Sequence, residues 1–260
     1  MPFVTVVVPA FNEEDSIIPC IRQLSEALQQ ATYHHEIIVV NDGSTDKTLE
    51  RAQSTRVNFP SIRTVDLGRN YGKATALREG VKRAKGDLIA FFDADLQYDP
   101  ADLVKLIGLA GNGAEVVTGR RDYGAYGLSR TAFSKLYNKI LRLVFQLDVA
   151  DSNCGMKVLT RQAANPKSLF TYGLPLILPL VKTNGVRIVE VPVGMRKRQA
   201  GESKYFHDGS FMGGWKNIRD IAYHSAMLVS LLSTLPFRDK SVKHGSSPSS
   251  FGKLLTEEAF

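Results

Sequence analysis

Two carboxylates and one amide occupy alternate positions in the stretch FFDADLQYDP, residues 91–100. The stretch ends an apolar run, DLIAFF, that predicts a buried strand. Strand side chains alternate between faces, so Asp93, Asp95 and Gln97 would lie on one side if the chain stays extended. Three oxygen-bearing side chains suit a hard divalent cation. The alternative interpretation is a strand that simply runs into an Asp/Pro turn.

The elements that must position these residues alternate between β-branched runs and helical patterns. Strands are predicted over residues 4–10, 36–40, 62–67 and 87–92. Apolar residues recur at helical spacing after the first strand (Ile17, Ile21, Leu24, Leu28) and after the third (Ala74, Leu77, Val81, Ala84). Continuous apolar strands, each followed by a helix, predict an α/β fold with a mainly parallel sheet covered on both faces.

Ligands of such sheets bind beyond the carboxyl ends of the strands. Polar residues follow all four strands: Pro9, Asn12 and Glu13; Asn41 and Asp42; Gly68, Arg69 and Asn70; Asp93, Asp95 and Gln97. We expect them to gather along one edge of the sheet. Asp42 is a candidate to bind a base or ribose, although NDGSTDKT also fits a βα turn capped by Asp46. Lys73 is a candidate phosphate contact, or else a solvated lysine at a helix start.

The second half of the chain is less regular. Strands are predicted over residues 114–120 and 186–193, and a helix over 128–147. Five apolar residues share one side of that helix: Phe133, Leu136, Ile140, Leu143 and Leu147. The dinucleotide fingerprint GxGxxG and the phosphate loop GxxxxGK[ST] are both missing, which excludes a standard dinucleotide site and a P-loop nucleotidase.

Composition limits the partners. The 260 residues carry a formal net charge of +7, which favours anionic partners. Two cysteines and a first segment without signal-peptide features predict a reduced, cytoplasmic location. No apolar run reaches the ~18 residues of a spanning helix. Two shorter apolar segments, 169–181 and 215–237, are candidates for contact with a membrane surface.

Five motifs in this order and spacing resemble family 2 glycosyltransferases of the GT-A fold: PAFNEE, VVNDGSTD, GRNYGKATA, GDLIAFFDADLQYDP and EVPV…RQAGESKY. The resemblance is strongest to the polyprenyl-phosphate branch, which includes dolichol-phosphate mannose synthases and enzymes that transfer glucose or a modified arabinose. It extends over about residues 3–225. The resemblance implies a GT-A catalytic domain over residues 1–212, followed by an interfacial helix at 213–238 and a flexible tail at 239–260.

The resemblance also implies a site. Asp95 and Gln97 would hold Mg²⁺ or Mn²⁺ on the donor diphosphate, with Asp93 at the ribose, the sugar or the metal. The nucleotide-sugar would contact Pro9, Ala10, Asn12, Glu13, Asp42, Lys73, Asp93 and Ala94. The residues expected to act in catalysis are Asp93, Asp95, Arg121, Arg130, Arg198, Ser203 and Lys204. The arginines and the lysine of this set would bind phosphate. The alternative is that they form a basic face exposed to solvent.

The acceptor determines the chemistry. A phosphate monoester is already anionic near pH 7, since its second pKa is about 6. Such an acceptor needs positioning more than a general base. Asp151 in DSNCGMK is the nearest candidate base, and we expect it to shape the acceptor site instead. Cys154 is not expected to be a catalytic thiol, because no histidine is placed to activate it.

The favoured function is inverting transfer of a hexose, mannose from GDP-mannose first, to a polyprenyl phosphate. Alternatives are a UDP-glucose or UDP-GlcNAc donor with the same acceptor, a soluble hydroxyl-directed transferase, and an inactive nucleotide-sugar-binding regulator. The expected location is peripheral, on the cytoplasmic face of a membrane, with a membrane-protein partner as one option. Nucleic acid is not an expected partner, because it would not explain the acids at the strand ends.

Overall fold

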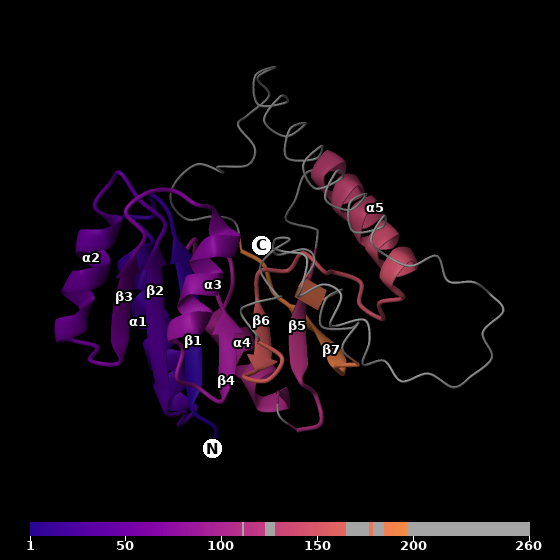
Figure 1. Ribbon diagram of the computed structural model, residues 1–260, viewed down its shortest axis with the longest axis horizontal. Coiled ribbons are helices and arrows are strands. Elements are labelled where there is room, and N and C mark those ends of the chain that lie inside the picture. Colours follow the sequence, from indigo (N-terminus) through magenta and orange to yellow (C-terminus); the bar gives the residue numbers. More distant parts are fainter. Residues whose placement is uncertain (111, 123–127, 165–176, 179–184, 197–260) are drawn as a thin grey trace, which may run out of the picture. The chain divides into compact units, whose positions relative to one another are not determined.

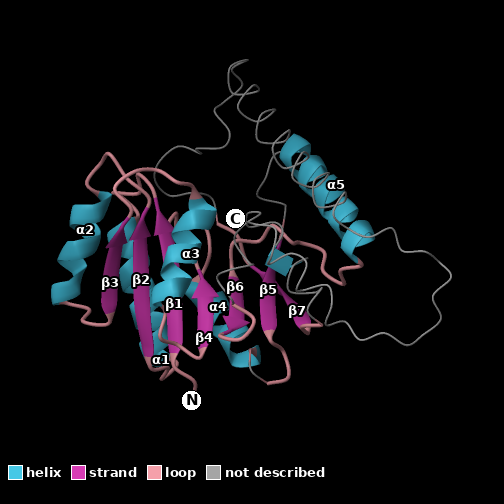
Figure 2. Cartoon of the chain, viewed as in Figure 1, coloured by secondary structure: helices cyan, strands magenta, loops and turns pink. Residues whose placement is uncertain are grey.

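A twisted sheet of seven strands organises the described part of the computed structural model (Figure 1). The structure describes residues 1–110, 112–122, 128–164, 177–178 and 185–196. The strands are β1 (Val4–Ala10), β2 (His35–Asn41), β3 (Ile62–Asp66), β4 (Leu88–Phe91), β5 (Val116–Arg121), β6 (Lys157–Thr160) and β7 (Ile188–Val193). Their order across the sheet is β3-β2-β1-β4-β6-β5-β7 (Figure 2).

Helices connect the strands. They are α1 (Ile17–Gln30), α2 (Thr48–Ser54), α3 (Lys73–Arg83), α4 (Pro100–Leu109) and α5 (Leu128–Phe145), with a short 3₁₀ helix at Thr55–Val57. Asp99 begins α4 by accepting the Ala101 N–H at 2.9 Å, and Pro100 occupies the first helical position. The Asp/Pro pair therefore starts a helix, as its sequence chemistry favours.

The alternation of β1 shows why two layers of helices are needed. Val4, Val6 and Val8 belong to the buried cluster that contains the apolar faces of α1 and α4. Val7 points to the opposite face, where a Cβ built on Gly80 of α3 would lie 2.2 Å from its Cγ1. Glycine at that position allows α3 to pack directly on the sheet. Helices on both faces confirm the predicted α/β architecture.

One strand departs from the expected pattern. Pairs β1–β2, β1–β4, β2–β3 and β5–β7 are parallel, whereas β6 runs antiparallel to both β4 and β5. The sequence analysis did not predict β6, because KVLT is short and begins with a lysine. Since β6 is reversed between β4 and β5, those two strands point the same way.

The α5 helix also differs from the expectation. Its predicted apolar side is not a single core face, because Leu136 and Leu143 are exposed while Leu147, just beyond the helix, is buried. Of the apolar segment 169–181, the described residues Ile177 and Leu178 are fully buried, so these two side chains do not contribute to an exposed surface. No helix in the described ranges is both long and apolar enough to cross a bilayer. The segment 215–237 and the predicted boundary at 212–213 lie outside the described residues.

Candidate active site

One edge of the sheet collects the predicted residues. Strands β1 to β5 and β7 end at this edge. The reversed strand β6 begins there, since its first residue, Lys157, pairs with Phe91 and Thr118. We call it the carboxyl edge. The chain runs outward from β1 to β2 and β3, then returns to β4 on the other side of β1. Connections after β1 and β4 therefore diverge, which is where ligands bind in open α/β sheets.

The stretch after β4 is a turn that keeps its alternating pattern. Asp93, Asp95 and Gln97 are partly exposed. Their alternate neighbours Ala94, Leu96 and Tyr98 are buried. The backbone is not extended, because Leu96 has a positive φ of 59° and the Gln97 N–H donates to Asp95 Oδ1 at 3.2 Å. The three oxygen-bearing residues are thus all partly exposed, but they belong to a turn and not to an extended strand.

Asp93 is held from two directions. Lys73, the first residue of α3, donates from Nζ to Asp93 Oδ1. A Cβ built on Gly155 would lie 2.3 Å from Asp93 Oδ2. The loop before β6 therefore packs against this carboxylate through a glycine, and a larger residue would have to displace it. Lys73 reaches the site as predicted, where a carboxylate rather than a phosphate pairs with it.

Asp42, the predicted contact of a base or ribose, is bonded to the backbone of the loop before α3. It is buried, and its carboxylate accepts the Tyr71 N–H at 2.8 Å and the Gly72 N–H at 2.9 Å. Burial raises the pKa of Asp42, and the two backbone hydrogen bonds oppose that rise. In this arrangement Asp42 fixes the loop that leads into α3 and so positions Lys73.

The loops after β1 and β2 are bonded to each other. Asn12 accepts the Thr45 N–H at 2.8 Å, and its own N–H donates to Ser44 Oγ at 2.9 Å. The Glu13 N–H donates to Thr48 Oγ1 at 2.7 Å. Asp46 accepts the Thr48 N–H at 3.0 Å, which supports its predicted capping role at the start of α2. The polar groups of these loops therefore build the rim of the site.

The loop after β2 also packs on the loop after β3. Gly43 has a φ of +68°, and a Cβ there would lie 2.2 Å from the Arg69 carbonyl carbon. Asn41 donates to Asp66 Oδ1 at 2.8 Å and accepts the Ser44 N–H at 3.3 Å. Its side chain is buried and serves the loop.

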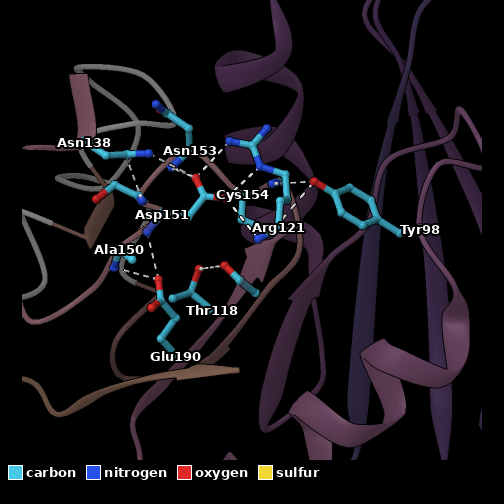
Figure 3. A network of polar contacts seen from close by, with 12 residues as sticks. Tyr98, Thr118, Arg121, Asn138, Ala150, Asp151, Asn153, Cys154 and Glu190 are labelled. Carbon is cyan, nitrogen blue, oxygen red and sulfur yellow. Dashed lines mark hydrogen bonds and ion pairs between the residues drawn. The ribbon is translucent and has the colours of Figure 1, made fainter. Parts of the chain in front are cut away.

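A network of polar contacts surrounds Asp151 (Figure 3). Arg121, at the end of β5, donates to Asp151 from Nε at 2.7 Å and from Nη2 at 2.8 Å. Asp151 is 0% exposed and the Arg121 side chain only 11% exposed. Burial alone would raise the pKa of Asp151, but the hydrogen bonds and charge of Arg121 hold it below its ordinary value. In this structure the guanidinium of Arg121, a predicted phosphate contact, pairs with a carboxylate.

Two further residues position the Asp151 loop. Glu190 of β7 accepts the N–H groups of Ala150 and Asp151, each at 2.8 Å. Asn138 of α5 donates to Asp151 Oδ1 at 3.4 Å and accepts the Ser152 N–H at 3.1 Å. Neither residue was predicted from the sequence, although a glutamate inside the apolar strand IVEV was a visible signal.

Lys157 was also missed. It is 0% exposed and donates from Nζ to the Cys154 carbonyl. Burial lowers its pKa to about 8, against the raising influence of Cys154 and Asp151. Burial raises the pKa of the Cys154 thiol. That shift and full burial agree with the expectation that Cys154 is no nucleophile. A lysine at the start of the apolar run KVLT was the signal available in the sequence.

The remaining predicted residues fall into two groups. Pro9, Ala10 and Ala94 lie at the carboxyl edge, where Ala10 and Ala94 are buried and offer backbone atoms. Arg130 lies on α5, but its side chain is outside the described part. Arg198, Ser203 and Lys204 also lie outside the described residues.

The side-chain oxygens of the turn after β4 suit a hard divalent cation that is also coordinated by water and by the substrate. Asp95 and Gln97 supply carboxylate and amide oxygens on the accessible side of the turn. Within the described ranges, no three His, Cys, Asp or Glu residues form a metal-binding group. Mg²⁺ is typically bound through one or two carboxylates plus substrate phosphates and water, so this small set fits it.

Known proteins resemble this chain in sequence and in fold. The chain is 31% identical over 240 residues to an undecaprenyl-phosphate 4-deoxy-4-formamido-L-arabinose transferase of Photorhabdus laumondii, covering 92% of this chain and 70% of the relative. The same enzyme of Edwardsiella ictaluri is 31% identical over 244 residues, with 92% and 71% covered.

The fold is shared with solved structures of glucosyl-3-phosphoglycerate synthase from Mycobacterium tuberculosis. One of them, with Mn²⁺, UDP-glucose and phosphoglyceric acid, superposes with a TM-score of 0.66 at 22% identity, over 91% of this chain and 82% of that one. These neighbours establish the GT-A fold. Residues 5–165 match the model of glycosyl transferase family 2. The chain therefore belongs to the family 2 glycosyltransferases.

Proposed function

We propose that this glycosyltransferase moves a sugar from a nucleoside diphosphate donor to a polyprenyl phosphate, with inversion at the sugar carbon. The observation that carries the proposal is the turn after β4, where Asp93, Asp95 and Gln97 are all partly exposed. A diphosphate leaving group gains negative charge as the glycosidic bond breaks. An edge that can hold a divalent cation against that charge is what the reaction requires.

The state of Asp151 favours a phosphate acceptor over a hydroxyl. A hydroxyl acceptor needs a base to remove its proton, and a good base is accessible with a pKa near the working pH. Asp151 is fully buried, paired with Arg121, and has a lowered pKa. It is therefore unsuited to that task in this arrangement. A phosphate monoester needs no such base. The names of the relatives above, which act on undecaprenyl phosphate, support the same acceptor class.

The residues then have distinct tasks. Asp95 and Gln97 would hold Mg²⁺ or Mn²⁺, which supplies charge neutralisation at the diphosphate when bound. Asp93 faces the donor, and Lys73 is placed to exchange its carboxylate partner for a donor phosphate. Backbone groups near Pro9, Ala10, Asn12, Glu13 and Ala94 would surround the nucleoside. Arg121 fixes the Asp151 loop beside Asp93 through its ion pair, and it stays a candidate for a phosphate contact. Arg130, Arg198, Ser203 and Lys204 stay candidates for phosphate contacts.

The sugar is the least constrained part of the proposal. The sequence analysis favoured mannose from GDP-mannose, but the relatives named above transfer a modified arabinose. A nucleotide-linked 4-deoxy-4-formamido-L-arabinose is therefore the first donor to test, ahead of GDP-mannose, UDP-glucose and UDP-GlcNAc. A lipid acceptor places the protein at a membrane surface, and we propose a peripheral position on its cytoplasmic face.

The test measures sugar transferred into an organic phase. Purified protein is incubated with Mn²⁺ or Mg²⁺, a short polyprenyl phosphate and each donor separately. We expect metal-dependent transfer from one donor. Asp95→Asn retains an oxygen to accept the Gln97 N–H but removes the charge, and we expect it to lower turnover at least about 100-fold. Glu26→Ala, at an exposed position on α1, is the matched control.

Other outcomes separate the alternatives. Transfer to a water-soluble sugar but not to lipid would make the enzyme hydroxyl-directed and overturn the acceptor proposal. Donor binding without any turnover would favour a nucleotide-sugar-binding regulator. An Asp95→Asn variant that is as active as the wild type would contradict the metal site.

A further inference from the structure

The α5 helix carries two stripes on its exposed side. Leu136, Ile140 and Leu143 recur at intervals of four and three, so they line one helical face. They are 59%, 37% and 72% exposed. Each is preceded by an exposed basic residue: Lys135, Lys139 and Arg142 respectively. The basic stripe therefore lies about 100° around the helix from the apolar stripe.

The opposite side of α5 is attached to the protein. Leu141 is fully buried, and the buried Asn138 bonds to the Asp151 loop. Burial of this side explains why the leucines of the other stripe are not in the core. A contiguous row of exposed large apolar residues marks an interaction surface, whereas single exposed leucines do not.

Charge selects the partner. The helix Leu128–Phe145 contains no Asp or Glu, and its basic residues flank the apolar stripe along the length of the row. An apolar stripe beside a basic one is the pattern of helices that lie in the interface of a membrane with anionic headgroups. A protein partner would need a matching acidic and apolar groove, whereas an anionic bilayer offers both features without specific shape.

We propose that α5 is a membrane-docking helix whose Leu136, Ile140 and Leu143 enter the headgroup region of an anionic bilayer while Lys135, Lys139 and Arg142 contact the headgroups. This rests on the proposed function only in that a lipid acceptor requires such contact. Asn138, on the attached side of the same helix, ties the docked surface to the loop that packs on Asp93. Docking would thus bring the carboxyl edge to the acceptor phosphate.

Vesicle sedimentation tests the surface with the full chain. Phosphatidylcholine vesicles are compared with vesicles that also contain phosphatidylglycerol. In the first variant, Lys135, Lys139 and Arg142 are all replaced by Gln. Each basic residue near an anionic surface contributes about fivefold in affinity, so we expect a loss of up to about 100-fold on anionic vesicles only. Its matched control carries the same charge change at the exposed positions Arg22, Arg56 and Lys82.

The second variant, Leu136→Ser with Leu143→Ser, removes apolar contact and should weaken binding about tenfold or more on both vesicle types. Leu109→Ser, at an exposed position on α4, is its control. Thermal unfolding should be unchanged in all of these variants, because the altered side chains are exposed. Turnover of a short, water-soluble polyprenyl phosphate should be retained in both α5 variants.

The results separate this inference from the proposed function. If both α5 variants bind vesicles as the wild type does, or if the wild type does not bind anionic vesicles, the docking proposal is wrong. If the leucine variant instead changes the solution mass of the protein, the stripe is an interface between copies. If the wild type transfers sugar to none of the polyprenyl phosphates, that result counts against the proposed function alone, since vesicle binding is measured separately.

Discussion

Lys157 should make the stability of this protein depend on alkaline pH in a way that one substitution removes. The ammonium is fully buried at the start of β6, and burial lowers its pKa from 10.5 to about 8. A difference of that size between folded and unfolded chains corresponds to about 3 kcal/mol. Below pH 8 the lysine is protonated in both states, so the folded state bears this whole cost.

The sign of the pH dependence follows from proton binding. Between pH 8 and 10.5 the unfolded chain binds more protons at this residue than the folded chain does. The free energy of unfolding therefore rises with pH through that window. About 2 kcal/mol of the cost should be recovered between pH 7 and pH 9.5. The buried Cys154 and Tyr98 act in the opposite direction, because their raised pKa values keep them protonated when folded.

Urea denaturation of the wild type and Lys157→Met at pH 7 and pH 9.5 isolates the lysine. Cys154, Tyr98 and the Arg121–Asp151 pair are present in both proteins, so their contributions largely cancel in the difference. We expect the variant to lose about 2 kcal/mol relative to the wild type over this interval. Lys47→Met, at an exposed position, should follow the wild type. Parallel pH profiles for the wild type and Lys157→Met would refute the reasoning, because they would mean that the site does not disfavour the charged amine.

Four further predictions concern the carboxyl edge. Gly155→Ala puts a methyl group where Asp93 Oδ2 lies and should lower kcat/KM about 100-fold, with Tm nearly unchanged; wild-type activity would contradict the packing. Asp151→Asn leaves the buried Arg121 uncompensated and should cost about 3–5 kcal/mol in urea denaturation, while replacing both residues by leucine and methionine should recover most of it. Gly43→Ala should destabilise by at least about 2 kcal/mol, measured the same way, because of its positive φ and the Arg69 backbone; a near-neutral effect would show that the two loops can separate. Removal of divalent cations by EDTA should abolish turnover, and Mn²⁺ or Mg²⁺ should restore it without a change in Tm; activity in EDTA would exclude a metal-dependent step.

Local pattern was enough for the sheet and for its functional edge. The strands at 4–10, 36–40, 62–67 and 87–92 are confirmed within two residues, because short runs rich in β-branched and aromatic residues between turn residues favour strands. The alternation of partly exposed Asp93, Asp95 and Gln97 with buried neighbours was also visible in the sequence. The resemblance of the motifs identified the family, which the comparison confirms.

The local sequence pattern does not show which side chains form hydrogen bonds or ion pairs with one another. Nothing adjacent in the sequence pairs Asp151 with Arg121, 30 residues away, or directs Asp42 to the loop before α3. β6 was missed for a related reason: a four-residue strand is stabilised by neighbours on both sides, not by its own composition.

The sequence by itself determined which residue types stand at the ends of the strands, and therefore the fold class, the family and the acids of the site. Only the tertiary structure decided which charges pair with one another and which stay accessible, since that depends on distances between segments far apart in the chain. It likewise decided that Leu136 and Leu143 of α5 are exposed while Asn138 is buried. A helical period shows that residues share a face, but the packing of the helix determines which face is covered.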